Sequence, residues 1–190
     1  MEEMVQLEEL ENPSYLQRTE GIGVLSLEDA LRLGATGPVL RASGMASDVR
    51  KEEPYEIYDR IDFDVPVKGE GDAYARNRIG IEEMIQSIGI VRQALDELPG
   101  GEVRASKFKK PKLATKIPAG EVYVRNEVAR GEAGMYMVSN GEKTPYRVKI
   151  RGPDFLHMIP VLEFLLKGAE VADIPAIYWS LNICPADMDR

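Results

Sequence analysis

Apolar residues recur at helical spacing between residues 72 and 98, and so long a helix fits into few small folds. They are Ile81, Met84, Ile85, Ile88, Val91, Leu95 and Leu98. Because this spacing gathers the side chains on one side, it predicts an amphipathic helix over 72–98, which ends at the Pro-Gly-Gly of 99–101. Gly80 and Gly89 each cost about 1 kcal/mol relative to Ala in a helix, and close packing of a second helix would explain both.

Weaker signals precede this helix. Residues 1–11 indicate the end of an acidic helix, and 25–34 predict a short helix with Ser26 as its N-cap. The rest of 12–71 is rich in Gly, Pro and Asp and shows little periodicity, which predicts an irregular loop region. So long a loop within a compact domain is usually functional or packed against a large partner.

The second half of the chain mixes strands and helices. Three alternating runs separated by turn sequences predict a small antiparallel meander within 121–150, and they lie at 121–128, 133–141 and 145–150. Helical patterns at about 154–167 and 169–181, followed by a tail, complete the terminal segment 154–190.

Composition excludes several classes of function. The 190 residues carry 24 Lys and Arg against 32 Asp and Glu, a net charge of −8, which disfavours nucleic acid as a partner. The one basic stretch, 104–116, is interpreted as a solvated loop. We expect no signal peptide and no membrane span. A single cysteine rules out an internal disulfide and fits a reducing compartment.

Motifs of common enzyme classes are lacking. The glycine-containing stretches contain neither a P-loop nor a dinucleotide fingerprint, so no motif supports NAD binding by this chain. His157, the only histidine, lies at an apolar helix start, where a structural histidine is more common than a catalytic or metal-binding one.

Charged residues of both signs lie among Gly and Pro rather than on a helix face. They are Arg41, Asp48, Arg50, Asp59, Asp62, Asp64, Asp189 and Arg190. Buried or interfacial ion pairs would hold irregular backbone in place, and loop-surface charge is the alternative.

The tail "SLNICPADMDR" contains the one cysteine, Cys184, followed three residues later by Asp187. A Cys-x-x-Cys pair at this place would be a good two-thiolate metal clip. One thiolate and one carboxylate are a poor pair for a soft metal, and the chain offers no second pair.

Several strings together resemble a known superfamily. "TGPVLRASG", "DVRKEEPY", "YDRIDFDVP", "PYRVKIRGP" and the terminal "DR" are similar to the D subunit of NADH-quinone oxidoreductase, respiratory complex I. The large subunits of membrane-bound nickel–iron hydrogenases resemble the chain as well. The likeness runs from about residue 12 to 190 and covers the C-terminal half of family members, and the tail is also similar to that of archaeal complexes of the sulfane-reductase type.

The resemblance implies an α+β fold, one domain over 1–190 with long helices of a bundle core and a small meander. In the hydrogenases two cysteines of the tail ligate nickel and iron. Here Cys184 takes the first position, Asp187 takes the second, and Asp189 with Arg190 closes the motif. We therefore expect no cofactor and no metal in this chain, with a [4Fe–4S] cluster in an adjacent small subunit.

The resemblance further implies a peripheral-arm subunit on the cytoplasmic face of the membrane, in an oxidoreductase linked to quinone or sulfur-type acceptors, NAD and ion translocation. Cys184 and Asp187 would line the acceptor cavity, Arg41, Asp48 and Arg50 would order the loop beside it, and Asp189 and Arg190 would anchor the terminus. Expected partners are the small [4Fe–4S] subunit, a chain carrying the missing N-terminal half, a chain like the C subunit of complex I, and membrane-arm subunits, which alone would contact the membrane. A non-catalytic scaffold subunit and an active nickel–iron hydrogenase are the alternatives.

Overall fold

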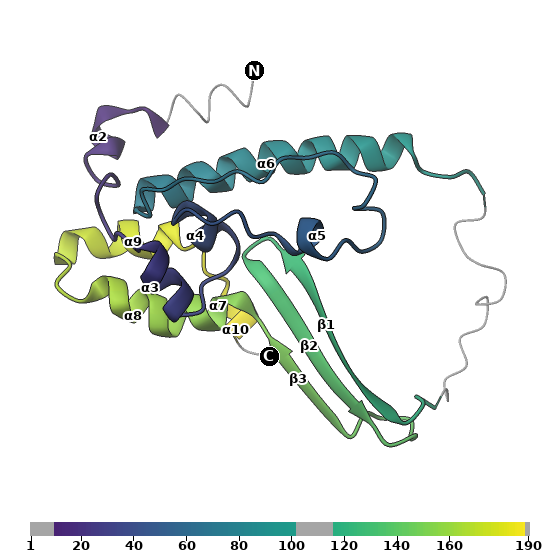
Figure 1. Ribbon diagram of the computed structural model, residues 1–190. Coiled ribbons are helices and arrows are strands. Elements are labelled where there is room, and N and C mark those ends of the chain that lie inside the picture. Colours follow the sequence, from purple (N-terminus) through teal and green to yellow (C-terminus); the bar gives the residue numbers. More distant parts are fainter. Residues whose placement is uncertain (1–9, 102–115, 189–190) are drawn as a thin grey trace.

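The computed structural model describes residues 10–101 and 116–188. Helices and one three-stranded antiparallel sheet form an α+β fold, which confirms the expected class (Figure 1). The long helix α6 (Ala73–Asp96) runs along one side, shorter helices gather beneath one end of it, and the sheet extends away from them as an arm. Most of the segments predicted at 1–11 and 104–116 lies outside the described residues.

The region expected to be irregular contains four short helices. They are α2 (Pro13–Leu16), α3 (Leu27–Arg32), α4 (Gly37–Ala42) and α5 (Val49–Glu52). Helix α3 confirms the predicted helix, and Ser26 Oγ accepts the backbone N–H of Asp29 as an N-cap. The expectation of irregular backbone is wrong at α4 and α5, which are helical. The sequence does not reveal them because each is too short to show helical periodicity.

Helix α6 confirms the long helix. It begins after Asp72, whose carboxylate accepts the N–H of Ala75 at 2.7 Å and that of Gly21 at 2.8 Å. It ends at Asp96 rather than at residue 98. The side of α6 that is buried in this chain contains Ala73, Ala75, Arg76, Ile79 and Ile90.

Most of the apolar stripe that identifies α6 in the sequence is exposed, whereas Ile81 and Ile85 are half-buried. Met84 is 49% exposed, Val91 57%, Leu95 65% and Leu98 70%, and Ile88 belongs to the same stripe at 42%. A Cβ added at Gly80 or Gly89 would meet no heavy atom within 4 Å. The expected close packing of a helix against these glycines is therefore wrong among residues 10–101 and 116–188.

The sheet confirms the predicted meander. Strands β1 (Gly120–Val128), β2 (Gly131–Ser139) and β3 (Arg147–Arg151) pair in sequence order, with Val124 opposite Met135 and Met135 opposite Ile150. The tight turn between Val128 and Gly131 ends against the helices, whereas the other end of the sheet points away from them (Figure 1).

The two predicted C-terminal helices are each interrupted. The first divides into α7 (Pro153–Leu156), a π-helical turn η2 (His157–Val161) and α8 (Leu162–Leu166). Pro160 lies within η2 and lacks the N–H that a regular helix needs, which accounts for the altered turn. The second divides into the 3₁₀ turn η3 (Val171–Asp173) and α9 (Ile174–Ser180), and α10 (Pro185–Met188) ends the described chain.

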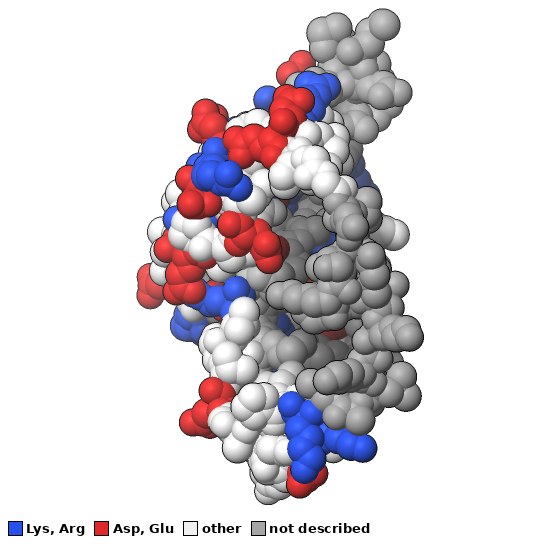
Figure 2. Space-filling model, turned by 90° about the vertical axis from the view of Figure 1, so that its right-hand side faces the viewer, with Lys and Arg blue, Asp and Glu red and all other residues white. Residues whose placement is uncertain are grey.

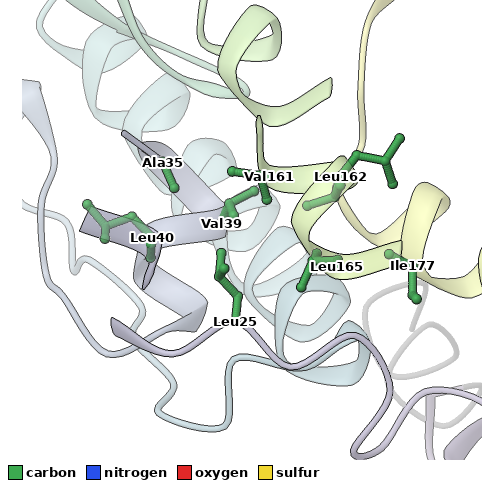
Figure 3. Close-up of a cluster of buried hydrophobic side chains, with 10 residues drawn as sticks. Leu25, Ala35, Val39, Leu40, Val161, Leu162, Leu165 and Ile177 are labelled. Atoms are coloured by element: carbon green, nitrogen blue, oxygen red, sulfur yellow. The ribbon is translucent and has the colours of Figure 1, made fainter. Parts of the chain in front are cut away.

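The main hydrophobic core joins the two ends of the sequence. Leu25, Val39 and Leu40 from the early helices and their connections meet Val161 and Leu165 from the C-terminal helices (Figure 3). Burial of this shared core therefore holds the tail-bearing helices against α3 and α4. Within the two described stretches, no helix is both long and apolar enough to cross a membrane.

Two glycines allow the sheet to touch α4 directly. Gly37 begins α4 with a φ of +60°, and a Cβ on it would collide with the Cα of Gly131 at the start of β2. Gly131 has a φ of +133°, and a Cβ there would collide with Thr36. Only glycine at both positions permits this backbone contact.

Candidate functional site: the C-terminal clasp and its surroundings

The tail is fastened to the start of α7 by two reciprocal hydrogen bonds. The backbone N–H of Cys184 donates to Asp154 Oδ2 at 2.8 Å. In turn, the backbone N–H of Asp154 donates to Asp187 Oδ2 at 2.9 Å. We call this arrangement of Asp154, Cys184 and Asp187 the clasp.

Asp187 acts as the cap of α7. Gly152 occupies the N-cap position of this helix and has no side chain with which to satisfy the first N–H groups. A carboxylate near a helix N-terminus is favourable because it accepts an N–H and faces the positive end of the helix dipole. A Cβ on Gly152 would collide with the Asp187 carboxylate, so the glycine makes room for it.

The residues at the clasp do not fit a nickel–iron centre. Cys184 is half-buried and is the single cysteine of the chain. The Asp187 carboxylate, in the place of a second thiolate, already accepts the Asp154 N–H. In the described parts of the chain, no group of three or more His, Cys, Asp and Glu residues is arranged to hold a metal ion. The chemistry of this donor set is that of a helix cap, not of a soft-metal clip.

His157 extends the clasp inward. His157 and Asp154 are both 0% exposed, and His157 Nδ1 lies 3.4 Å from Asp154 Oδ1. On the other side of the ring, the backbone N–H of Thr36 donates to Nε2 at 3.4 Å. The imidazole thus stands between the clasp and the residue that precedes α4.

A second site, the Arg41 cluster, is built around a buried guanidinium. Arg41 is 1% exposed and contacts Glu83 at 2.6 Å, Glu127 at 2.9 Å and the Ser47 carbonyl at 2.7 Å. Asp48 lies 4.0 Å away. The cluster therefore joins α4, α6 and β1 across long separations in sequence.

Arg50 completes the cluster through Asp48. Its Nε and Nη2 donate to the two carboxylate oxygens of Asp48 at 2.9 and 2.6 Å, a bidentate pair. The guanidinium also lies 4.8 Å from the centroid of the Phe63 ring. These contacts order the backbone of α5 next to β1, where Glu127 Oε2 accepts the N–H of Val49.

Burial and ion pairing shift the pKa values of the residues of the Arg41 cluster in opposite directions. Burial raises the pKa of Glu83 and of Glu127 above the ordinary glutamate range, and Arg41 offsets this only in part. Burial alone would raise the pKa of Asp48, but the hydrogen bonds and charge of Arg50 outweigh it and hold this pKa below its usual range. Burial alone would lower the pKa of Arg41, but the two glutamates hold it above its ordinary value.

A cavity of about 440 Å³ lies between α6, α4, α9 and the turn after β1. Glu83 of the Arg41 cluster lines it, and so do Arg76, Arg130 and Asn182. The backbone of Asn182, just before the clasp, adopts a φ of +52° and its carbonyl accepts from Arg130. The tail thus reaches the cavity through Asn182, whereas Cys184 and Asp187 do not line it.

Arg76 is an unusual member of the cavity wall. Its guanidinium donates to Ser180 Oγ and to the carbonyls of Gly71 and Gly23 at 2.7 to 3.0 Å. Burial lowers its pKa to about 10, and the charge of Asp72 opposes this shift. Arg76 therefore ties α6 to α9 through neutral acceptors.

Other predicted site residues lie apart from both sites. Asp59, Asp62 and Asp64 are exposed, as the surface-charge alternative describes for this part of the chain. Asp189 and Arg190 lie outside the described residues. On the face seen in Figure 2, acidic and basic side chains are interspersed rather than gathered by sign.

Three residues of the clasp and of the Arg41 cluster are not among the site residues that the sequence predicts. Asp154 lies 30 residues from Cys184, Glu83 lies 42 from Arg41, and Glu127 lies 86 from Arg41. Asp154, one residue after Pro153 in the first turn of a helix, carries a capping signal but nothing that points to the tail.

Comparisons with known proteins agree with the resemblance seen in the sequence. The family model described as "Respiratory-chain NADH dehydrogenase, 49 Kd subunit" matches residues 1–115 and 104–190. The D subunit of NADH-quinone oxidoreductase from Dehalococcoides mccartyi (strain ATCC BAA-2266 / KCTC 15142 / 195) is 47% identical over 179 residues, which cover 94% of this chain and 47% of that protein. The D subunit of F(420)H(2) dehydrogenase from Methanosarcina mazei (strain ATCC BAA-159 / DSM 3647 / Goe1 / Go1 / JCM 11833 / OCM 88) is 44% identical over 178 residues, 93% of this chain and 47% of that protein.

A solved structure is also similar. It belongs to the membrane-bound sulfane sulfur reductase, an archaeal respiratory membrane complex, with a TM-score of 0.86 and 43% identity. The likeness covers 99% of this chain and 53% of that chain. The present chain thus spans about half the length of the relatives that it matches.

Proposed function

Because the chain belongs to the family of the 49 kDa subunit of respiratory-chain NADH dehydrogenase, we propose that it is a peripheral subunit of a membrane-associated oxidoreductase complex. The names of its relatives support this proposal, since they are subunits of NADH-quinone and F(420)H(2) dehydrogenases, and the similar structure belongs to a respiratory membrane complex. In the proposed complex the chain is held at the cytoplasmic face of the membrane by its partners.

A more specific part of the proposal concerns the role of the clasp. Cys184 and Asp187 form part of the wall of a second cavity, which the chain shapes together with a small partner subunit. In it, electrons pass from a [4Fe–4S] cluster of that subunit to a quinone or sulfur-type acceptor. Asp187 serves there as a helix cap, which supports a wall made of protein rather than of a metal centre. Arg41, Asp48 and Arg50 keep the neighbouring loop in place, while Asp189 and Arg190 anchor the terminus.

The exposed stripe of α6 identifies the surface for a further partner. Ile81, Ile88 and Leu95 are spaced by seven residues, and so are Met84, Val91 and Leu98. This spacing is the a/d pattern by which one helix packs along another. The occupant is a helix from the half of the relatives' length that this chain lacks, and Gly80 allows it to approach closely. A chain like the C subunit of complex I and membrane-arm subunits complete the proposed assembly.

The proposal is tested in the assembled complex by acceptor reduction and by metal analysis. Cys184→Ala and Asp187→Asn are the informative variants, and Asp62→Asn, an exposed aspartate outside the clasp, is the matched control. We expect acceptor reduction to fall in the first two variants while the complex stays intact and the control keeps its activity. Stoichiometric nickel bound through Cys184 would overturn the proposal of a wall without a metal centre.

A scaffold subunit is the second candidate, and one observation favours it. Every polar contact of the clasp named above goes to the protein itself, so the tail is also well suited to a purely structural role. Full acceptor reduction in an intact complex that carries both Cys184→Ala and Asp187→Asn would establish the scaffold and exclude the cavity wall.

A further inference from the structure

The contact between Asp154 and His157 leaves two polar atoms without an ordinary hydrogen bond. Asp154 Oδ1 and His157 Nδ1 are buried, face each other at 3.4 Å, and have no hydrogen-bond partner in the described parts of the chain. Buried polar atoms are nearly always paired, so a facing couple of this kind calls for a specific explanation. A proton held between the two atoms supplies one.

The contact made by the other ring nitrogen, Nε2, determines which ring atom carries the proton. Nε2 accepts the backbone N–H of Thr36 and therefore carries no proton itself. The single hydrogen of a neutral imidazole must then lie on Nδ1, where it points at the Asp154 carboxylate. We propose that Asp154 and His157 form a buried proton-holding pair that positions the tail, and that a second proton enters at Nε2 only by displacing the Thr36 N–H.

The pair connects parts of the molecule that are far apart in sequence. Asp154 uses its second oxygen to hold the Cys184 N–H, so the carboxylate serves the imidazole and the tail together. Thr36 precedes α4, and its Oγ1 accepts the N–H of Glu132 at the start of β2. Loss of the Thr36 contact therefore loosens the junction between the tail, α4 and the sheet.

The local backbone suits such a change. His157 begins the π-helical turn η2, a kind of turn that is frequent at functional sites. Proton uptake adds H⁺ from solvent to Nε2 and produces an imidazolium next to the Asp154 carboxylate. The two charges then pair across the contact between Nδ1 and Asp154 Oδ1.

The other titratable groups around the imidazole come from three elements. Asp154 is on α7, Asp187 and Cys184 are on the tail and are linked to it through the Asp154 backbone and carboxylate, and Glu132 on β2 is bonded to Thr36. Glu132 is itself paired with Arg125 and Arg151, which leaves Asp154 as the carboxylate that acts on the ring.

The biological role that we assign to this pair rests on the proposed function, because protonation of the pair would change the wall of the acceptor cavity. The test of the pair needs no redox activity, because the chain contains a single histidine, whose ring nitrogens give an unambiguous signal. The 190-residue chain is labelled with ¹⁵N-histidine, and its ring nitrogens are followed by NMR from alkaline to acidic pH. Amide exchange at Thr36 is measured on the same samples, with Ile79 of α6 as the reference for global unfolding.

We expect the Nδ1–H tautomer at alkaline pH. On acidification the ring becomes doubly protonated, and exchange at Thr36, corrected for its intrinsic pH dependence, accelerates about tenfold or more while Ile79 stays protected. In Asp154→Asn, which keeps an acceptor for Cys184 but loses the charge, the acceleration of Thr36 exchange at the same acidic pH should be about tenfold smaller.

Two results would overturn the inference. One is an Nε2–H tautomer in the unmodified chain, and the other is an Asp154→Asn variant in which Thr36 exchange accelerates on acidification as it does in the unmodified chain. His157→Gln keeps an acceptor near Thr36 without a titrating ring, and pH-dependent exchange at Thr36 that persists in this variant would assign the effect elsewhere. The NMR result and acceptor reduction are separate measurements, so failure of one leaves the other interpretable.

Discussion

The Asp187 carboxylate caps the helix that begins at Pro153 by accepting the N–H of Asp154, a residue 33 positions earlier in the chain. The bond is returned by Asp154, which holds the N–H of Cys184. The tail position for which the sequence raises the question of a metal ligand therefore has a structural partner here. This pairing makes the clasp testable by stability as well as by activity.

Removal of the cap should destabilise the chain measurably. Asp187→Ala deletes the acceptor for the Asp154 N–H, and loss of an N-capping side chain costs about 1 kcal/mol. Asp187→Asn retains a side-chain oxygen and should lose less than half as much. Urea unfolding of the two variants beside the unmodified chain measures both changes, and equal losses would show that the hydrogen bond is not the source.

Gly152 should be coupled to Asp187. Gly152→Ala places a Cβ against the carboxylate, so the substitution should destabilise the unmodified chain more than it destabilises the Asp187→Ala variant. A double-mutant cycle in urea measures the difference, and contacting residues of this kind couple by roughly 0.5–3 kcal/mol. Additive effects would mean that Gly152 is required for its backbone alone.

The Arg41 cluster should give stability an unusual pH dependence. Burial raises the pKa of Glu83, so the folded chain binds more protons than the unfolded chain from the ordinary value near 4.5 up to the raised value. In that window the contribution of Glu83 to stability falls as the pH rises. Glu83→Gln cannot titrate, so its stability relative to the unmodified chain should increase with pH across the window.

Urea unfolding from pH 4 upward checks this sign. Glu163→Gln, at an exposed glutamate of α8 that lies beside Lys167, is the control and should shift the curve little at any pH. A relative stability of Glu83→Gln that instead decreases with rising pH would mean that Arg41 outweighs burial at this carboxyl.

A charge on the α6 stripe should disrupt assembly but not folding. Leu95 is 65% exposed in this chain, so Leu95→Asp should change its stability by no more than about 0.5 kcal/mol. In the complex the same charge would be buried against a partner helix, which is unfavourable. Co-purification of the chain that carries the missing half should be lost with Leu95→Asp and retained with the neighbouring control Asp96→Ala.

Local signals explain which elements the sequence predicts correctly. Helix α3 follows from its cap at Ser26, and the meander follows from strict alternation between recognisable turns. Helix α4 is held by contacts of Arg41 with Glu83 and Glu127, and α5 by the bond of the Val49 N–H to Glu127, and no local pattern contains these contacts. The orientation of α6 could not be predicted either, because its apolar stripe faces away from the rest of the described chain.

The candidate site likewise contains residues that the sequence predicts and residues that only the folded structure identifies. Resemblance pointed to Cys184 and Asp187, but the partner that binds both, Asp154, is defined only by folding of the tail onto α7. Arg41, Asp48 and Arg50 were grouped from the sequence, whereas Glu83 and Glu127 come from a helix and a strand that look ordinary in isolation. Contacts over such separations are set by topology rather than by spacing.

The contact of Gly37 with Gly131 has a consequence for how this chain can be mutated. A mutational scan would report two intolerant positions, yet they are one constraint, because the atom that a new Cβ at Gly37 meets is main chain at Gly131. No second substitution can relieve a clash with backbone, so neither glycine can be replaced and later compensated. The tight turn before Gly131 is therefore fixed against α4 by main-chain atoms alone.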